Sequence, residues 1–348
     1  MMDISIPYYE DLTRISNSNI GWFLQKGPAF LHKMLTDPPP EEKNSVLERG
    51  SMIHMYILQP EEFQKTYVVW DKSRPSSAQQ EKFCQELANT LEIEPNRAIL
   101  SAYQAAYSTK GKSEETMLSE GLKIASTLKD YIDFLKLHDG RTMISPYDAQ
   151  MLDKIRQNIQ SHKLAKQIIE PHGKSIGVHQ LFDHIGRDEG ISPIVSHHEF
   201  HINWTYYVKM AAGVDCKSLL DGLTLDFKNK KATIYDLKTT QKLWHFEDSI
   251  DQYDYCRQLC YYYQAVVWYL KYELKEDPNS WTFEFYIIGI DTTGSYEIRV
   301  FKVDNFMIDS RKAVIMDAMK EIMWHQEHNK WEHSRAYYEG DGSESLNL

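Results

Sequence analysis

The sequence predicts an α/β fold that carries a large helical insertion. The first half of the chain has the apolar periodicity of amphipathic helices, and from residue 197 the pattern changes to the alternation of strands. A long aromatic helical segment then separates three strand-like segments from two more. Strands and helices in this order form layered α/β domains. At 348 residues the chain can bury a sizeable core, as one large domain or two.

The first half of the chain favours helices. Residues 8–34 predict a polar start and an amphipathic helix that breaks near Gly27-Pro28, because proline removes a helix hydrogen bond. Residues 44–58 predict a second helix. Residues 61–170 are mostly helical and charged, and end in an amphipathic helix over 145–169.

The second half favours strands around one helix. Strands are predicted over 197–210, 216–227, 231–240, 281–291 and 295–303, a helix over 251–274 and a last helix over 305–331. We therefore expect four parts. These are an N-terminal helical part of the core (1–64), a helical insertion or lid (65–180), the α/β core (181–335) and a disordered tail (336–348).

Two charged residues interrupt the apolar strand over 231–240. Asp236 and Lys238 are two apart, so their side chains share one face of that strand. The preceding segment is nearly symmetric about Lys228-Asn229, which predicts a hairpin with Asp221 opposite Asp236. Opposed side chains lie about 5 Å apart at Cβ, and two carboxylates that close favour a shared proton or cation. The group is either a structural ion triad or a site for Mg²⁺ or Mn²⁺ bound through oxygen.

Asp215 and Asp226 are the other candidate partners of Asp236. The same hairpin symmetry places Asp215 opposite residue 242, beyond the Asp-Leu-Lys segment, and Asp226 opposite Lys231 beside the turn. The symmetry therefore favours Asp221.

Several motifs stand in the order of a known family. They are Gly50-x-x-x-His54, Glu199, Asp221, Asp236-Leu237-Lys238 and Gln258-x-x-x-Tyr262. Together they resemble the PD-(D/E)XK nuclease superfamily, in its RecB/RecE-like branch, and residues 48–63 and 143–170 resemble its exodeoxyribonuclease VIII-like subgroup from bacteria and phages. The resemblance covers most of residues 8–305 and is weakest over 65–140. It implies a restriction-endonuclease-like core of helix, three-stranded meander, helix and strand.

The resemblance also implies roles for these residues. One or two Mg²⁺ ions, with Mn²⁺ as a substitute, would be held by His54, Glu199, Asp221, Asp236 and the Leu237 carbonyl. The catalytic residues would be Asp221, Asp236, Lys238 and Glu199. Gln258 and Tyr262 would support the site and contact DNA. Because Lys238 lies beside two acids we expect it to be protonated, so it would orient water or add positive charge and would not act as the base.

The implied activity is hydrolysis of DNA phosphodiester bonds, as an exonuclease on duplex ends in recombination, repair or phage DNA processing. The implied partners are DNA, a single-strand annealing protein and further copies of the chain. Two alternatives stay open. One is a catalytically silent nuclease-fold DNA-binding or adaptor protein, and the other is a CRISPR-adaptation-like nuclease without an iron–sulfur cluster. No cluster is expected, because no cysteine follows Cys260. The site residues do not separate DNA from RNA.

Composition limits the partners further. The net charge of −11 argues against a protein that coats polyanions, although a local basic surface is compatible with it. Candidate residues for that surface are Lys209, Lys217, Lys228, Lys230, Lys231 and Lys242, although the lysines over 228–231 fit solvated turn residues better. No apolar run approaches the roughly 20 residues of a membrane helix. Without a signal-like N-terminus or a disulfide framework, we expect a cytoplasmic protein, and the resemblance implies a bacterial cell or phage-infected host.

Overall fold

The computed structural model describes residues 6–40, 45–91, 94–137, 140–170, 194–209 and 212–344. The chain divides into two compact units, one of residues 1–59 with 152–348 and one of residues 60–151. The insertion predicted over 65–180 overlaps the second unit but extends further. Residues 152–170 belong to the first unit, because the helix at their end packs on the edge of its sheet. Residues 171–180 lie outside the described part.

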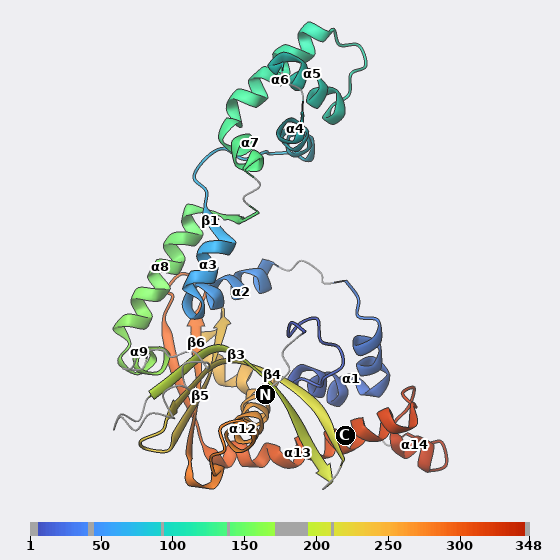
Figure 1. The fold of residues 1–348 in the computed structure, drawn as a ribbon, viewed down its shortest axis with the longest axis vertical. Coiled ribbons are helices and arrows are strands. Elements are labelled where there is room, and N and C mark those ends of the chain that lie inside the picture. The colour runs from blue at the N-terminus through green and yellow to red at the C-terminus, as the bar shows by residue number, and fades with distance from the viewer. Residues whose placement is uncertain are drawn as a thin grey trace. The chain divides into compact units, whose positions relative to one another are not determined.

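The first unit contains a five-stranded sheet in the order β3-β4-β5-β6-β7 (Figure 1). The strands are β3 (Ile194–Lys209), β4 (Ala212–Asp226), β5 (Lys231–Thr240), β6 (Thr282–Asp291) and β7 (Ile298–Val303). β3, β4 and β5 form an antiparallel meander, β6 runs parallel to β5 after a helical crossover, and β7 returns antiparallel. The predicted α/β fold class, with its meander, helix and following strand, is confirmed.

The β4–β5 hairpin has the predicted register. Its ladder runs from Asp226 opposite Lys231 to Gly222 opposite Tyr235. The next position along β4 is Asp221 and the next along β5 is Asp236. The two acids therefore lie just beyond the last paired residues of β4 and β5.

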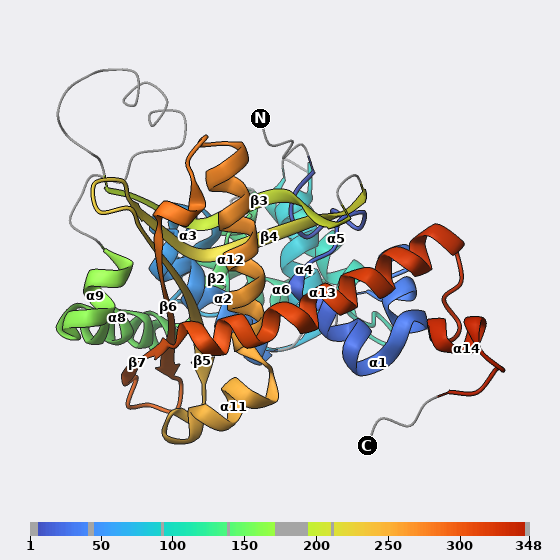
Figure 2. The ribbon, with the colours of Figure 1, turned by 90° about the horizontal axis from the view of Figure 1, so that it is seen from below.

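One face of this sheet is covered by helices. The crossover passes through η1 (Leu243–His245) and α11 (Phe246–Gln252) to α12 (Tyr255–Tyr272). α12 packs on β3, β4 and β5, and α13 (Asn305–His328) packs on α12 (Figure 2). α1 (Asn17–Thr36) packs on α13 and has the predicted break, since Gly27 has a φ of 82° before Pro28. The interface is apolar, with Ile234, Leu259, Ala265, Phe285 and Ile315 among its buried members.

α2 (Ser45–Leu58) packs on the opposite face of β5. A Cβ added at Gly50 would lie 3.2 Å from Thr239 Oγ1, so the bare backbone lets the helix approach the strand. Thr239 alternates with Lys238, which points toward the α12 face. The helix predicted over 145–169 is two helices, α8 (Pro146–Ser161) and α9 (Lys163–Ile169). The break is at His162, whose Nδ1 accepts a hydrogen bond from the Ala165 amide and caps α9.

The second unit is mainly helical. It contains α3 (Pro60–Thr66), β1 (Tyr67–Val69), α4 (Ala78–Asn89), α5 (Pro95–Ala106), α6 (Glu114–Thr127), α7 (Lys129–Lys136) and β2 (Thr142–Ile144). β1 and β2 pair in parallel, and α4 to α7 enclose an apolar core around Phe83, Ile99 and Ile132.

The C-terminus differs from the expected tail. Helix α14 (Arg335–Glu339) begins after Ser334, whose side chain caps it by accepting from the Tyr337 amide. The predicted tail from residue 336 therefore starts inside a helix, because its cap lies two residues earlier. None of the helices in the part of the chain that the structure describes has the length and apolar character to cross a bilayer.

Candidate active site

Three ligand-type side chains meet where β4 and β5 separate. One ligand atom each of His54 on α2, Glu199 on β3 and Asp221 on β4 lie within 4.8 Å of one another. His54 Nδ1 is 3.7 Å from Asp221 Oδ2. All three side chains are half-buried, so the cluster is partly shielded from water. The predicted helix and strand positions of these residues do bring them together.

The β3–β4 ladder changes its regular form at this cluster. The neighbouring pairs of the ladder are His198 with Gly222 and Phe200 with Leu220. Glu199 therefore lies opposite Asp221, and it has a left-handed backbone, with a φ of 47°. That conformation costs a non-glycine residue on the order of 1–3 kcal/mol, and such strain concentrates at functional sites. On this irregular backbone, a Glu199 carboxylate oxygen lies within 4.8 Å of the His54 and Asp221 ligand atoms.

A tyrosine bridges the strands in the row beside the acids. The ring of Tyr235 crosses Gly222, where an added Cβ would lie 2.0 Å from the ring, and its hydroxyl is 2.7 Å from His198 Nδ1. Neither Tyr235 nor His198 is predicted as a site residue from the sequence. The signal that could have found them is the isolated glycine within a strand, which marks a close approach of another group.

Asp236 and Lys238 form the second half of the site. Asp236 is only 2% exposed, and its Oδ1 accepts a hydrogen bond of 2.9 Å from Gln258 Nε2. Gln258 Nε2 also contacts the Tyr262 hydroxyl at 2.8 Å. The other carboxylate oxygen, Oδ2, forms an ion pair with Lys238, although it has no hydrogen bond of normal geometry among the described residues. The two motif residues of α12 thus hold Asp236 in place.

The main chain of Leu237 connects the two halves. Its amide donates a hydrogen bond of 2.6 Å to Asp221 Oδ2. A hydrogen bond between His54 and the Leu237 main chain also raises the pKa of His54, against stronger opposing effects. Leu237 itself is fully buried on the face opposite Asp236. The Leu237 main chain therefore contacts both Asp221 and His54 of the cluster.

Burial and crowding shift the protonation of the cluster. Burial, with the Asp221 and Asp236 carboxylates, raises the pKa of Glu199 to about 8. Burial also raises the pKa of Asp221, and that of Asp236 to about 6. Burial and the Lys238 ammonium lower the pKa of His54 to about 4, so this imidazole is neutral at pH 7. Burial alone would lower the pKa of Lys238, but the Asp236 and Asp221 carboxylates outweigh it and raise that pKa.

This donor set fits a hard divalent cation. Two bonds of about 2.1 Å to one ion allow donor atoms to lie up to roughly 4.2 Å apart, and the donor atoms of the His54–Glu199–Asp221 cluster lie within 4.8 Å of one another. Carboxylate oxygens and a neutral imidazole suit Mg²⁺ or Mn²⁺. Burial raises the pKa of both Glu199 and Asp221, and the neighbouring carboxylates add to the rise at Glu199, so a bound cation would stabilise the charged forms of these acids. Asp236 lies beside this cluster and pairs with Lys238.

The rival aspartates lie elsewhere on β4. Asp226 is opposite Lys231 at the turn, and its carboxylate accepts from Asn229. Asp215 is opposite Thr205, six residues before Asp221. The hairpin register thus places Asp221, and neither of the other two, beside Asp236.

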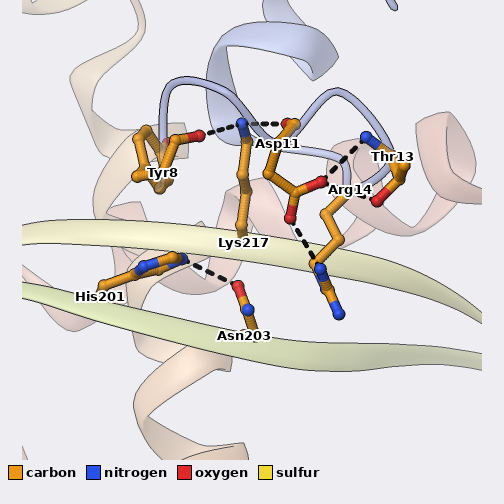
Figure 3. Close-up of polar contacts among 7 residues, drawn as sticks. All are labelled: Tyr8, Asp11, Thr13, Arg14, His201, Asn203 and Lys217. Carbon is orange, nitrogen blue, oxygen red and sulfur yellow. Dashed lines mark hydrogen bonds and ion pairs between the residues drawn. The ribbon is translucent and has the colours of Figure 1, made fainter. Parts of the chain in front are cut away.

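The expected basic surface needs a correction at Lys217. This side chain is 6% exposed, and its Nζ donates to the main-chain carbonyls of Tyr8 and Asp11 (Figure 3). The segment that covers it is held by Asp11, which accepts from Thr13 and Arg14. Lys217 is therefore a buried side chain that holds the N-terminal segment through two hydrogen bonds. The prediction was wrong because that segment packs over a strand some 200 positions away.

Unlike Lys217, two other lysines of the expected basic surface form ion pairs with acids. Lys230 and Lys231 form ion pairs with Glu276 and Glu284. The side chain of Lys209 lies outside the described part of the chain.

The sequence matches a known protein family. Residues 16–336 match the family described as PDDEXK-like domain of unknown function (DUF3799). A crystal structure of a provisionally assigned exonuclease from Eubacterium rectale is similar at a TM-score of 0.47 and 12% sequence identity, over 100% of this chain and 96% of that one. No curated protein matches the sequence significantly.

Proposed function

The chain belongs to the PDDEXK-like family that its residues 16–336 match, and on that premise we propose that it is a metal-dependent deoxyribonuclease. The observation that carries the proposal is the meeting of His54, Glu199 and Asp221 beside the Asp236–Lys238 pair. A structural ion triad needs no imidazole and no third acid. Five such groups at the point where two strands separate are the composition of a hydrolytic metal site.

His54, Glu199 and Asp221 would hold the divalent ion, with Asp236 and the Leu237 carbonyl as the adjoining oxygen donors. A bound Mg²⁺ or Mn²⁺ would acidify water and polarise the phosphate. The chain supplies the positions of the donors. Gln258 fixes Asp236 and the Leu237 amide fixes Asp221, so neither carboxylate has to reorganise when substrate arrives.

Lys238 would act as a fixed positive charge. Its raised pKa keeps the ammonium protonated at neutral pH, which makes it a donor to a phosphate oxygen or to the attacking water. It cannot accept the proton of that water. Charge that develops on the phosphate in the transition state would strengthen its interaction with Lys238, which is the condition for a catalytic contribution.

The resemblance to exodeoxyribonuclease VIII supports duplex ends as the substrate. On this proposal the enzyme is an exonuclease that processes DNA ends in recombination or phage DNA metabolism, as an oligomer and beside a single-strand annealing protein.

The test is digestion of a linear duplex and of a covalently closed circle of the same sequence. We expect the purified protein to degrade the linear duplex with Mg²⁺ or Mn²⁺, to spare the circle, and to lose activity in excess chelator. Cleavage of both forms would contradict the exonuclease assignment. Undiminished cleavage in chelator would contradict the metal mechanism, and DNA binding without cleavage in any divalent ion would indicate an adaptor protein.

A further inference from the structure

An aromatic ladder leads from the active-site lysine to the protein surface. The Lys238 ammonium lies 5.0 Å from the ring centroid of Tyr255. The ring of Tyr255 is stacked with that of Tyr253, at a centroid distance of 5.8 Å and an interplanar angle of 22°. Tyr253 is 55% exposed, whereas Tyr255 is half-buried. Tyr253 is thus a largely exposed ring, stacked on the ring that contacts Lys238.

The turn that carries the two tyrosines is hydrogen-bonded to α12 and α13. Asp254, between them, has a left-handed backbone with a φ of 46°, which is strained for a residue other than glycine. Its carboxylate caps α12 through the Arg257 amide and accepts a hydrogen bond of 2.7 Å from Arg311 Nε. Phe246 lies 6.0 Å from the inner ring of Tyr255 and supports it from α11. An exposed tyrosine on a fixed turn is preorganised to bind, because little entropy is lost on contact.

We propose that Tyr253 and Tyr255 form a stacking platform that receives an unpaired base of the DNA strand being cut. The inference rests on the proposed nuclease function and adds a positioning role for residues outside the metal cluster. A nucleic-acid strand brings both a phosphate and a base, and the ladder offers a cation at one end and a flat ring at the other. Base–aromatic stacking tolerates every sequence, which suits an enzyme that processes ends.

The platform requires a substrate whose terminal base is unpaired. A base can reach an exposed ring only when it is unpaired, so the terminal pair would have to fray before cleavage. A substrate with an unpaired terminal nucleotide would be spared that cost. We therefore expect the enzyme to cut a frayed or overhanging end faster than a blunt one.

The experiment measures binding and cleavage separately. Binding of a fluorescently labelled single-stranded oligodeoxynucleotide is measured in Ca²⁺, and cleavage of a linear duplex in Mg²⁺, for the wild type and for Tyr253→Ala, Tyr253→Phe and Tyr207→Ala. Tyr207 is the matched control, since it is 53% exposed and lies near another tyrosine ring, but is eight residues along β3 from Glu199, about 26 Å. Thermal melting of each variant checks folding.

Tyr253→Ala should weaken oligonucleotide binding about tenfold, within the range for loss of one stacked base, while Tyr253→Phe and Tyr207→Ala stay within about twofold of wild type. The binding affinity is also measured for a series of oligonucleotides that each lack one base at a different position. If Tyr253 only supported the fold, its substitution would not change how affinity depends on that position. One abasic position should weaken wild-type binding by a similar factor and have almost no further effect on Tyr253→Ala.

Equal oligonucleotide affinity of the wild type and Tyr253→Ala would overturn the platform. It would also be overturned if wild-type affinity fell by the same factor whichever position of the oligonucleotide lacked its base. Wild-type cleavage in Mg²⁺ together with either result would leave the nuclease proposal standing. Tyrosine-dependent binding without cleavage would support base stacking on Tyr253 but contradict the nuclease, and with it the platform's role in cleavage. If the wild type neither bound nor cut DNA, both would be wrong.

Discussion

Binding of a divalent ion should release a proton from Glu199. In the metal-free protein the pKa of this carboxyl is about 8, so it is mostly protonated at pH 7. A protonated carboxyl is a poor metal ligand, and the ion must therefore displace the proton. His54 does not compete in this range, because its pKa of about 4 leaves it neutral.

The magnitude follows from the fraction of ionised Glu199. With a pKa of about 8, roughly one molecule in eleven is ionised at pH 7 and ten in eleven at pH 9, so the affinity for one ion should rise about tenfold between these values. At pH 7.5 about 0.8 proton should be released per ion bound. The Glu199→Gln variant should bind more weakly and show a smaller rise over the same range. The rise that remains would come from Asp221, whose pKa burial also raises, because Asp236, with a pKa of about 6, is already ionised.

Isothermal titration calorimetry with Ca²⁺ checks both numbers. Affinity is measured at pH 7, 8 and 9, and proton release from titrations at pH 7.5 in two buffers of different ionisation enthalpy. Asp215→Asn, on the same sheet but away from the cluster, serves as the control and should titrate like the wild type. An affinity that stays constant from pH 7 to 9, or the same tenfold rise in Glu199→Gln, would refute the assignment of Glu199 as a ligand.

Three further changes test the surrounding structure. Lys238→Met should abolish detectable cleavage. It should also lower the melting temperature more at pH 8 than at pH 5. The buried Asp236 carboxylate, whose folded pKa is about 6, is charged at pH 8 and loses the cation that stabilises this form. Gly222→Ala should destabilise the fold by about 2 kcal/mol in a denaturant titration, because its Cβ would overlap the ring of Tyr235; an unchanged midpoint would show that the ring moves freely. Gln258→Ala should lower kcat about tenfold to a hundredfold at unchanged KM in steady-state cleavage assays, because the Asp236 carboxylate loses its hydrogen-bond donor. A change in KM alone would place Gln258 in substrate binding.

The β4–β5 hairpin shows what the sequence can predict. Its turn and its two strands are adjacent in the chain, so the symmetry about Lys228-Asn229 was enough to place Asp221 next to Asp236, and the structure has that register. The break of α1 at Gly27 was equally local, because the backbone requirements of Gly and Pro act on their own neighbours.

Long-range packing limited the rest of the prediction. The burial of Lys217 depends on a segment near the N-terminus, and the left-handed backbone of Glu199 depends on strand pairing that no nearby residue specifies. The helix predicted from residue 251 begins at Tyr255, because Asp254 adopts a left-handed conformation and caps it. The tyrosine ladder starts at that cap, and it was hidden in a segment that looked like continuous helix.

The most direct test of the account compares two aspartates of one strand in the cleavage of end-labelled linear duplex with Mg²⁺. Asp221→Asn removes a carboxylate from the His54–Glu199–Asp221 cluster and should slow cleavage at least about a thousandfold, or roughly 4 kcal/mol of transition-state stabilisation. Asp215→Asn, six residues earlier on β4 and opposite Thr205, should cost less than about tenfold in the same assay. If Asp215→Asn were inactive while Asp221→Asn still cut the duplex, the proposed metal site would be wrong, and only the Asp236–Lys238 pair would remain as a candidate.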